Sequence, residues 1–476
     1  MNYAEVAVNS PGSRSTFCYA IPPGLNISAG QAVWVPFGSR VIQGIVLRLS
    51  DEPSVEETKE IAGIVTDFPL LSPIQIQLAQ WISEHYFAPP FDALALMLPP
   101  GFERRAITCF QLTDSQVDLL LTQEQRQVLH IMGGKKNTSL PELEKAIGKR
   151  KARQITDQLL TRQLITQTLE LEKARVKPKT LPYIKLIADR EEIEVEKARL
   201  DKSRAYKQAE LLGFLTGQTQ PISISELRKR LNCSLATIKA LESRHLVSME
   251  RLRIRRDPLS HLSFTTSPAP VLTSSQQDAW ESIQDVIVKE ARQPSKPPVF
   301  LLFGVTGSGK TEIYLRALAQ VIAAGKQGIC LIPEIALTQQ TVERFANRFP
   351  GRVAVLHSGL SPGEQFDEWQ WIMEGNCDVV IGPRSALFAP LPNLGLIIID
   401  EEHEWTYKQE DKSPRYHARD VAIKLAQLSD AIVILGSATP DIGSFHKAQQ
   451  GEYHLIELKE RITPRGYSPL PEVSIV

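Results

Sequence analysis

A glycine-rich stretch, LLFGVTGSGKTEIYL at residues 301–315, has the residue types needed to hold a phosphate. It contains the spacing GxxxxGK[ST] as Gly304, Gly309, Lys310 and Thr311. The glycines let successive backbone amides point at a phosphate, at the positive end of the helix that follows. Because an apolar run precedes the glycines, the pattern predicts a buried strand, a phosphate-binding loop and a helix.

The loop predicts a role for each of its side chains. Lys310 would reach the β- and γ-phosphates of a nucleotide, and the hydroxyl of Thr311 would hold Mg²⁺. The backbone cradle would be formed by Gly304, Val305, Thr306, Gly307, Ser308 and Gly309. At average composition this spacing arises by chance in about one chain in fifty of this length. The alternative is a tight glycine turn without a ligand.

An acidic segment, LGLIIIDEEH, follows later in the chain. Asp400 comes at the end of its apolar run, where ligands of open α/β sheets bind. We expect Asp400 to hold Mg²⁺ together with Thr311, and Glu401 to act as the base for water. An acidic pair after a strand can simply cap a helix. Placed 90 residues after Lys310, it predicts an ATP site with Lys310, Asp400 and Glu401 as catalytic residues.

The elements that must position these residues begin after a Ser/Thr/Pro-rich linker at 257–275. Apolar runs (VFLLFG, GICLIP, VAVLH, DVVIG, LGLIIID, AIVILG) alternate there with amphipathic segments. Such runs are typical of strands buried on both faces, so we expect a RecA-like, doubly wound parallel sheet over 259–476. In SPGEQFDEW, Ser361 can cap a helix that starts at Pro362, with Glu364 as the capping-box partner.

Three further units are expected before this sheet. Residues 1–104 alternate apolar and polar residues between Pro and Gly breaks, which predicts a β-rich domain closed by a helix. Residues 115–180 and 203–258 form an approximate repeat: Leu227 aligns with Leu143 and Leu246 with Leu164, at offsets of 84 and 82 residues. We expect two winged-helix-like α+β units.

The second of these units ends in MERLRIRRDP. Its alternating Arg251, Arg253 and Arg255 would lie on one face of a strand, available to a phosphate backbone. A solvated edge strand protected by charge is an equal alternative. Such units also serve as protein-contact modules or spacers.

Composition excludes several classes of protein. Apolar residues make up 42% of the 476 and charged residues 23%, which is typical of a folded multidomain chain. Lys and Arg total 54, as do Asp and Glu, so any nucleic-acid footprint must be local. Five scattered cysteines without a CxxC pair argue against disulfides or a zinc site and favour the cytosol. No signal peptide and no long apolar run is present, so no membrane partner is expected.

Five short motifs resemble those of superfamily 2 helicases of the DEAH/DExH type. Asp400, Glu401, Glu402 and His403 resemble the signature box, and GSATP at 436–440 resembles the motif that couples hydrolysis to movement. The resemblance implies that Gln276, in LTSSQQ, reads adenine and that Glu402 and His403 belong to the nucleotide site. It also implies that PEIALT and GPRSALFAP grip single-stranded DNA, through Thr338 and Arg384.

The motifs more closely resemble the bacterial replication restart helicases, the primosomal protein N′ family. VPFGSR and RSTFCYAIPPGL resemble the domain of that family that holds the 3′ end of a nascent strand. Phe17, Gly38 and Lys59 match its binding residues, but Cys18 stands where the family has an aspartate. A thiol accepts a hydrogen bond from a 3′-hydroxyl poorly, so we expect weakened recognition. Taken alone, Phe17 and Gly38 would be ordinary core and turn residues.

The segment EWTYKQEDKSPRYHARD resembles the aromatic-rich loop of this family. In such a loop aromatic rings stack on unpaired bases while cations meet phosphates. The resemblance implies DNA contacts for Trp405, Tyr407, Lys408 and Tyr416. A packed loop is the alternative.

The resemblance implies an ATP- and Mg²⁺-dependent 3′–5′ DNA helicase in the bacterial cytoplasm that recognises stalled forks and restarts replication by assembling the primosome. Implied partners are forked and single-stranded DNA, single-strand binding protein and other primosome proteins. Full-length members carry a zinc module and a second lobe with transition-state arginines; neither is recognised here. We therefore expect nucleotide binding with weak or lost hydrolysis. Another superfamily 2 repair translocase and a non-catalytic fork-binding adaptor remain alternatives.

Overall fold

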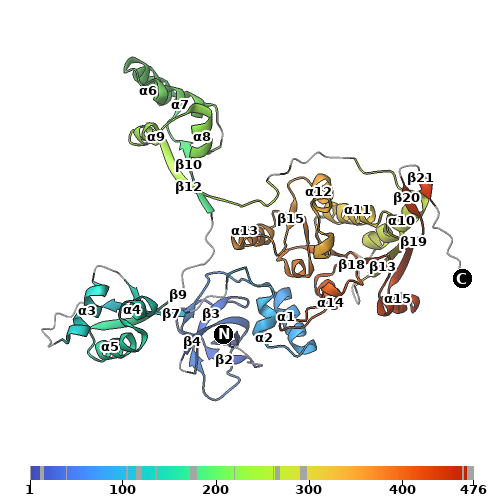
Figure 1. Cartoon of the computed structure of the whole chain (residues 1–476), viewed down its shortest axis with the longest axis horizontal. Coiled ribbons are helices and arrows are strands. Elements are labelled where there is room, and N and C mark those ends of the chain that lie inside the picture. Colours follow the sequence, from blue (N-terminus) through green and yellow to red (C-terminus); the bar gives the residue numbers. More distant parts are fainter. Residues whose placement is uncertain are drawn as a thin grey trace. The chain divides into compact units, whose positions relative to one another are not determined.

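The computed structural model describes the chain except at residues 1, 11–14, 39, 103–105, 114–120, 134–136, 172–178, 219, 261, 263–267, 290–296, 464–465 and 469–476 (Figure 1). The described residues form two units. One contains residues 1–175 and 259–476, and the other contains residues 176–258. Residues 261 and 263–267 of the expected linker lie outside the described residues, as do residues 103–105 around the end of the first expected domain.

The N-terminal domain is a six-stranded sheet in the order β5-β2-β1-β4-β3-β6. Its strands are β1 (Tyr3–Val8), β2 (Phe17–Ala20), β3 (Ala32–Phe37), β4 (Arg40–Ser50), β5 (Lys59–Glu60) and β6 (Gly63–Ile64). Helices α1 (Pro73–His85) and α2 (Pro90–Ala95) follow. Ser72 and Gln75 form a capping box at the start of α1, and Pro73 takes the first helical position. The predicted β-rich domain closed by a helix is confirmed.

The next segment is a small α+β unit with the sheet order β8-β7-β9. Its elements are β7 (Ala106–Leu112), α3 (Gln123–Met132), β8 (Thr138–Ser139), α4 (Leu140–Ile147), α5 (Lys149–Thr161) and β9 (Ile165–Leu171). Leu143 and Leu159 are fully buried at its centre, together with Ile155.

The separate unit repeats this order of elements with one additional helix. It contains β10 (Lys179–Leu186), α6 (Arg190–Lys202), α7 (Tyr206–Thr216), β11 (Ile222–Ser223), α8 (Ile224–Leu231), α9 (Leu235–Glu242) and β12 (Val247–Ile254). Leu227, the repeat partner of Leu143, is fully buried as well. Of the three wing arginines, Arg251 and Arg253 lie on β12. Arg255 lies beyond the end of β12, so the prediction that the three arginines share one face of a strand is wrong. The Nη2 of Arg255 lies 3.6 Å from Oδ1 of Asp257.

The C-terminal lobe is a seven-stranded sheet in the order β15-β16-β14-β17-β18-β13-β19. The strands are β13 (Val299–Gly304), β14 (Gln327–Leu331), β15 (Val353–Val355), β16 (Val379–Gly382), β17 (Leu394–Ile399), β18 (Ile432–Ser437) and β19 (His454–Leu458). Every pair in it is parallel. All residues of β17 and β18 are buried, which explains their uninterrupted apolar runs.

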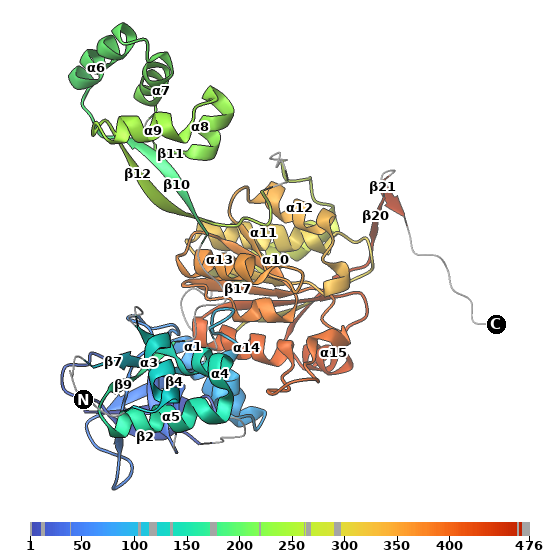
Figure 2. The same ribbon diagram turned by 60° about the vertical axis from the view of Figure 1, so that its left-hand side comes forward.

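Helices cover both faces of this sheet. They are α10 (Ser274–Lys289), α11 (Lys310–Ala323), α12 (Gln339–Arg348), α13 (Pro362–Met373), α14 (Ala418–Ser429) and α15 (Ile442–Gln449). Figure 2 shows α11 and α12 on one side of β17 and α14 and α15 on the other. Ser361 and Glu364 form the expected capping box at the start of α13. The predicted doubly wound parallel sheet is confirmed.

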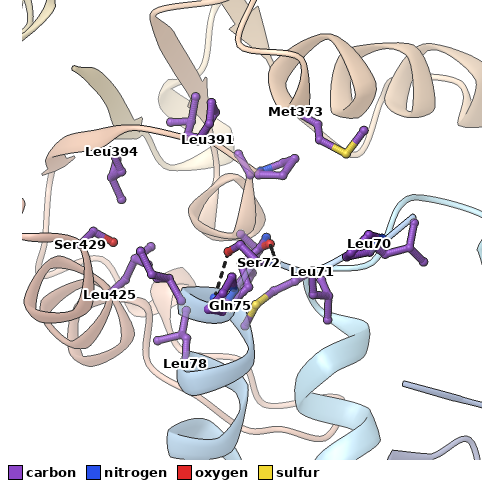
Figure 3. A pocket seen from close by; sticks show the side chains of 18 of the residues that line it. Leu70, Leu71, Ser72, Gln75, Leu78, Met373, Leu391, Leu394, Leu425 and Ser429 are labelled. Carbon is purple, nitrogen blue, oxygen red and sulfur yellow. Dashed lines mark hydrogen bonds between the residues drawn. The ribbon is translucent and has the colours of Figure 1, made fainter. Parts of the chain in front are cut away.

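The N-terminal domain packs on this lobe through α1 and α14, which lie within the same unit. Leu78 and Ile82 of α1 share one apolar cluster with Val421 and Leu425 of α14. Beside this contact lies a cavity of about 750 Å³. Its lining is mostly apolar, and Figure 3 shows the Ser72–Gln75 capping box among the leucines. Among the described helices none is long and apolar enough to cross a membrane.

Candidate nucleotide and DNA site

The glycine loop connects the end of β13 at Gly304 with the start of α11 at Lys310. Gly307 and Gly309 both have a φ of +84°, a left-handed conformation that favours glycine. Lys310 is 8% exposed, and its Nζ donates a hydrogen bond of 2.9 Å to the carbonyl of Gly304. The same Nζ lies 3.7 Å from Oε1 of Glu401. The loop therefore holds its lysine beside the acidic segment.

Asp400 follows directly after β17, at the edge of the sheet where Gly304 also lies. Its Oδ1 accepts a hydrogen bond of 3.0 Å from the hydroxyl of Tyr314, and its carbonyl accepts one of 2.7 Å from Tyr407. Burial, together with the adjacent charge of Glu401, raises the pKa of Asp400 to about 6. Carboxylates with raised pKa values cluster at functional sites.

These residues line one cavity of about 320 Å³. It is lined by Val305, Thr306, Gly307, Ser308, Gly309, Lys310, Thr311, Arg344, Asp400, Glu401 and Ile462. The predicted catalytic residues and the predicted Mg²⁺ ligands are thus brought together. Among the residues that the structure describes, the buried Ser308 hydroxyl has no hydrogen-bond partner and a Cβ at Gly307 would meet open space. A lysine, a helix N-terminus, a hydroxyl and carboxylates are the groups that suit a phosphate with a hard cation.

Gln276 contacts the loop itself and does not line the cavity. Its Nε2 donates a hydrogen bond of 2.9 Å to the carbonyl of Ser308, and its Oε1 accepts one of 3.1 Å from the amide of Thr273. A Cβ at Gly309 would lie 2.2 Å from this Nε2, so Gly309 must be glycine for the contact to form. Gln276 supports the phosphate loop in this structure, and its contact with adenine stays a prediction.

Glu402 lies in a different environment from its neighbour Glu401. It is 1% exposed and accepts hydrogen bonds from Arg419 at 2.9 Å, from the hydroxyl of Ser444 at 3.0 Å and from the amide of Asp441 at 2.7 Å. These donors come from α14 and from the start of α15. The structure corrects the expectation for Glu402, since its carboxylate joins three elements of the scaffold and does not line the cavity.

His403 does not line the cavity, but its Nδ1 lies 3.7 Å from Oε2 of Glu401, which does. Its Nδ1 lies 2.7 Å from the hydroxyl of Ser437, which in turn accepts a hydrogen bond of 2.9 Å from the amide of Thr439. His403 therefore joins the DEEH segment to the GSATP segment. A direct contact of His403 with nucleotide stays a prediction.

The aromatic-rich loop departs from expectation at two of its three rings. Tyr407 and Tyr416 are each 1% exposed, so neither ring face is open to a base. Tyr407 is held by its hydrogen bond to Asp400, and Tyr416 packs edge-on against Phe388 at 5.2 Å. Trp405, in contrast, is 72% exposed. Stacking by the two tyrosines is a wrong prediction for this conformation, because tertiary partners bury them, whereas Trp405 stays a candidate.

The predicted DNA-contacting polar residues make contacts within the chain. The Nη1 of Arg384 donates to the carbonyls of Thr406 at 3.0 Å and Lys408 at 2.8 Å, so it holds the aromatic-rich loop in place. The Nζ of Lys408 donates a hydrogen bond of 2.8 Å to the carbonyl of Arg415. Thr338 caps α12. Direct DNA contacts of these residues stay predictions.

The predicted 3′-end residues lie on the N-terminal sheet. The ring of Phe17 packs edge-on against Phe37 at 5.2 Å, and Gly38 follows Phe37 with a φ of +59°. Lys59 is exposed and pairs with Tyr19, two residues beyond Phe17 on β2. The sheet therefore places these residues on neighbouring strands and turns.

Cys18 lies opposite Glu5 of the neighbouring strand. Residues directly opposite each other in a sheet present their side chains on one face. Burial acts to raise the pKa of Glu5, but hydrogen bonds from Thr16 and Arg48 lower it overall. An ionised carboxylate thus stands beside Cys18.

Three residues that the sequence patterns did not indicate belong to this region. Arg344 lines the nucleotide cavity and a second cavity of about 290 Å³ next to it. The amide of Ile462 donates a hydrogen bond of 3.0 Å to the carbonyl of Gly307. Tyr86 of the N-terminal domain accepts a hydrogen bond of 3.2 Å from the amide of His417. Each contact joins residues far apart in the sequence, so no local pattern could have indicated it.

No group of three or more His, Cys, Asp or Glu side chains among the described residues could hold a metal ion by itself. The five cysteines are free thiols, and four of them are buried. Thr311 and Asp400 would hold Mg²⁺ only together with a nucleotide that supplies further oxygen ligands.

Two parts of the chain match known protein families. Residues 5–99 match the 3′ DNA-binding domain (3′BD) of PriA, and residues 273–447 match the DEAD/DEAH box helicase family. Replication restart protein PriA of Bacillus subtilis is 38% identical over 493 residues, which cover 100% of this chain and 58% of the relative. The Synechocystis sp. protein of the same name is 35% identical, with 100% and 56% covered.

The chain thus spans little more than half the length of these curated relatives. Among solved structures, RecG bound to a three-way DNA junction is 25% identical and covers 43% of this chain and 25% of that chain, with a TM-score of 0.31. Helicases of the matched family use a nucleotide and Mg²⁺. On the two domain matches and the whole-chain identity to its relatives, the chain belongs to the PriA family of replication restart proteins.

Proposed function

We propose that this chain is the fork-recognising and ATP-binding part of a 3′–5′ DNA helicase that restarts replication at stalled or abandoned forks. One observation carries the proposal. Lys310, Thr311, Asp400 and Glu401 converge on one cavity at the carboxyl edge of a parallel sheet, in a chain whose N-terminal domain matches a 3′ DNA-binding domain.

The residues around the cavity divide the work of ATP hydrolysis. Lys310 and the N-terminus of α11 stabilise the negative charge of the phosphates. Thr311 and Asp400 would hold Mg²⁺, and the ion would supply positive charge that stabilises the phosphates. Glu401 orients the attacking water and accepts its proton.

The DNA-binding surface is proposed to include Phe17, Gly38 and Lys59 for the 3′ end and Trp405 for single-stranded DNA. Arg384 acts on DNA indirectly, because it anchors the loop that carries Trp405. Single-strand binding protein and other primosome proteins are the proposed partners, in the bacterial cytoplasm where replication takes place.

Fork binding tests the proposal. Fluorescence anisotropy at fixed salt would compare forks whose nascent strand ends in a 3′-hydroxyl with forks that end in a 3′-phosphate. We expect tighter binding to the hydroxyl, and we expect Lys59→Ala to reduce that preference about fivefold through loss of one contact worth about 1 kcal/mol. Lys59 is exposed, so the substitution leaves the fold intact.

Lys447→Ala is the matched control for this experiment, because it also removes one exposed positive charge. Both variants lose general attraction to phosphates, and only Lys59→Ala is expected to change the preference for the 3′ end. Equal binding of wild-type protein to both forks would contradict restart at 3′ ends. It would favour a different repair translocase or an adaptor.

A further inference from the structure

A buried tyrosine hydroxyl lies against the carboxylate proposed to hold Mg²⁺. Tyr314 is 1% exposed and donates a hydrogen bond of 3.0 Å to Oδ1 of Asp400. Tyr314 comes four residues after Lys310 on α11, so the two side chains lie on the same face of the helix. One helix face therefore carries both the phosphate-binding lysine and a partner of the metal-binding carboxylate.

The same hydroxyl also contacts the strand that carries the GSATP segment. A Cβ built at Gly436 would lie 1.6 Å from the Tyr314 hydroxyl oxygen and 2.7 Å from its Cζ. No side chain fits there, so the close approach requires glycine at position 436. Because β17 and β18 are adjacent in the sheet, the hydroxyl lies between the ends of the two strands.

The hydrogen bond restricts how the Asp400 carboxylate can turn. A buried hydroxyl needs a hydrogen-bond partner, and Asp400 is the partner of Tyr314. A phenol carries its proton at neutral pH, so Tyr314 is the donor in this hydrogen bond. The backbone amide of Glu401 also donates to this carboxylate, so the phenol and the amide together set how its oxygens face the cavity. Groups that orient a metal ligand in this way strongly affect metal affinity.

We propose that Tyr314 is a positioning residue that sets the orientation of Asp400 toward the Mg²⁺ of the bound nucleotide. Through α11 it also keeps this carboxylate in register with Lys310. The inference rests on the proposed ATP site and adds to it a residue that does not contact the nucleotide.

Mg²⁺-dependent binding of a fluorescent ATP analogue to the 476-residue chain tests the role of Tyr314 without requiring hydrolysis. Tyr314→Phe keeps the buried ring and removes only the hydroxyl. We expect the Mg²⁺ concentration for half-maximal binding to rise about tenfold, with affinity for the analogue unchanged in EDTA. A purely structural role would weaken binding equally with and without Mg²⁺.

Tyr453→Phe is the matched control. Tyr453 is a 7% exposed tyrosine of the same lobe, and its hydroxyl accepts a hydrogen bond from Lys447 instead of contacting the site. We expect wild-type Mg²⁺ dependence for this variant. Gly436→Ala should displace the Tyr314 hydroxyl without removing it, and we expect this variant also to need more Mg²⁺ for half-maximal binding. It replaces Tyr314→Phe in the experiment if that variant is too unstable to study.

A double-mutant comparison shows whether Tyr314 acts through Asp400. In an Asp400→Asn background, Tyr314→Phe should cause no further change in Mg²⁺ dependence. If the wild-type chain needs Mg²⁺ to bind the analogue and Tyr314→Phe shows the same Mg²⁺ dependence, the role of Tyr314 is overturned and the proposed ATP site stands. A wild-type chain that binds the analogue without any Mg²⁺ dependence would overturn the proposed site and the inference with it.

Discussion

At the scale of single residues, the proposed recognition of a 3′ end depends on what stands at position 18. The family resemblance leads one to expect a carboxylate there, and a neutral thiol is a poor acceptor for a 3′-hydroxyl. The N-terminal sheet places Glu5 directly opposite, with its carboxylate ionised by Thr16 and Arg48. We predict that the Glu5 carboxylate, one strand away, supplies the acceptor missing at position 18.

Glu5→Gln should therefore lower the preference for a 3′-hydroxyl over a 3′-phosphate more than Cys18→Ser does. An amide oxygen accepts a hydrogen bond more weakly than a carboxylate, by about 1 kcal/mol or fivefold in affinity. The Arg48 side chain that pairs with Glu5 is 73% exposed, so the fold should lose little stability. Anisotropy on the two forks checks this, and a larger effect of Cys18→Ser would contradict it.

At the scale of helices and strands, the DEEH segment is held by ionic contacts as well as by the sheet. Glu402 joins the end of β17 to α14 through Arg419 and to α15 through Ser444. Arg419 also lies 3.0 Å from Asp441, so the cluster has two acidic groups around one guanidinium. Residues 400 and 401 can face the cavity because this cluster anchors their neighbour.

Glu402→Ala should destabilise the lobe by about 3 kcal/mol, since it leaves a partly buried guanidinium with fewer partners. Urea denaturation followed by tryptophan fluorescence would measure the change. Glu281→Ala, at an exposed glutamate of α10, is the control and should cost less than about 0.5 kcal/mol. Equal effects of the two substitutions would mean that the cluster around Glu402 contributes no more than a surface contact.

At the scale of the whole molecule, the N-terminal domain and the helicase lobe meet at the first turn of α14. His417 caps this helix: its Nδ1 accepts a hydrogen bond of 3.2 Å from the amide of Arg419, and its own amide donates to Tyr86 of the N-terminal domain. Burial, followed by the charge of Arg419, lowers the pKa of His417 below its ordinary value of 6.5. The folded protein therefore favours the neutral imidazole, which alone can accept the capping hydrogen bond.

The sign of the pH dependence follows from this. In the unfolded chain His417 takes up a proton near pH 6.5, whereas in the folded protein it does so only at a lower pH. The contribution of His417 to the free energy of unfolding is therefore complete above about pH 6.5 and is lost as the pH falls below that value. Melting temperatures between pH 7.5 and 5.5 should fall more for the wild-type protein than for His417→Asn. Asparagine also caps helices but does not titrate in this range. Parallel curves for the two proteins would contradict a role of His417 protonation.

Much of the helicase lobe follows from local sequence. The phosphate loop is a contiguous segment whose glycines and lysine determine its path, and strands buried on both faces must be continuously apolar. For the same reason the sequence alone indicated Lys310, Thr311, Asp400 and Glu401, and the structure brings them to one cavity.

Only the tertiary structure decided which neighbouring side chains face the cavity and which are buried. Glu401 lines the cavity while Glu402 is enclosed, and Trp405 is exposed while Tyr407 is buried. Tyr314 meets Asp400, which lies 86 residues away along the chain. The physical reason is that exposure and hydrogen-bond partners depend on elements packed from elsewhere in the chain, whereas the residue types and their spacing record only the local backbone and its chemistry.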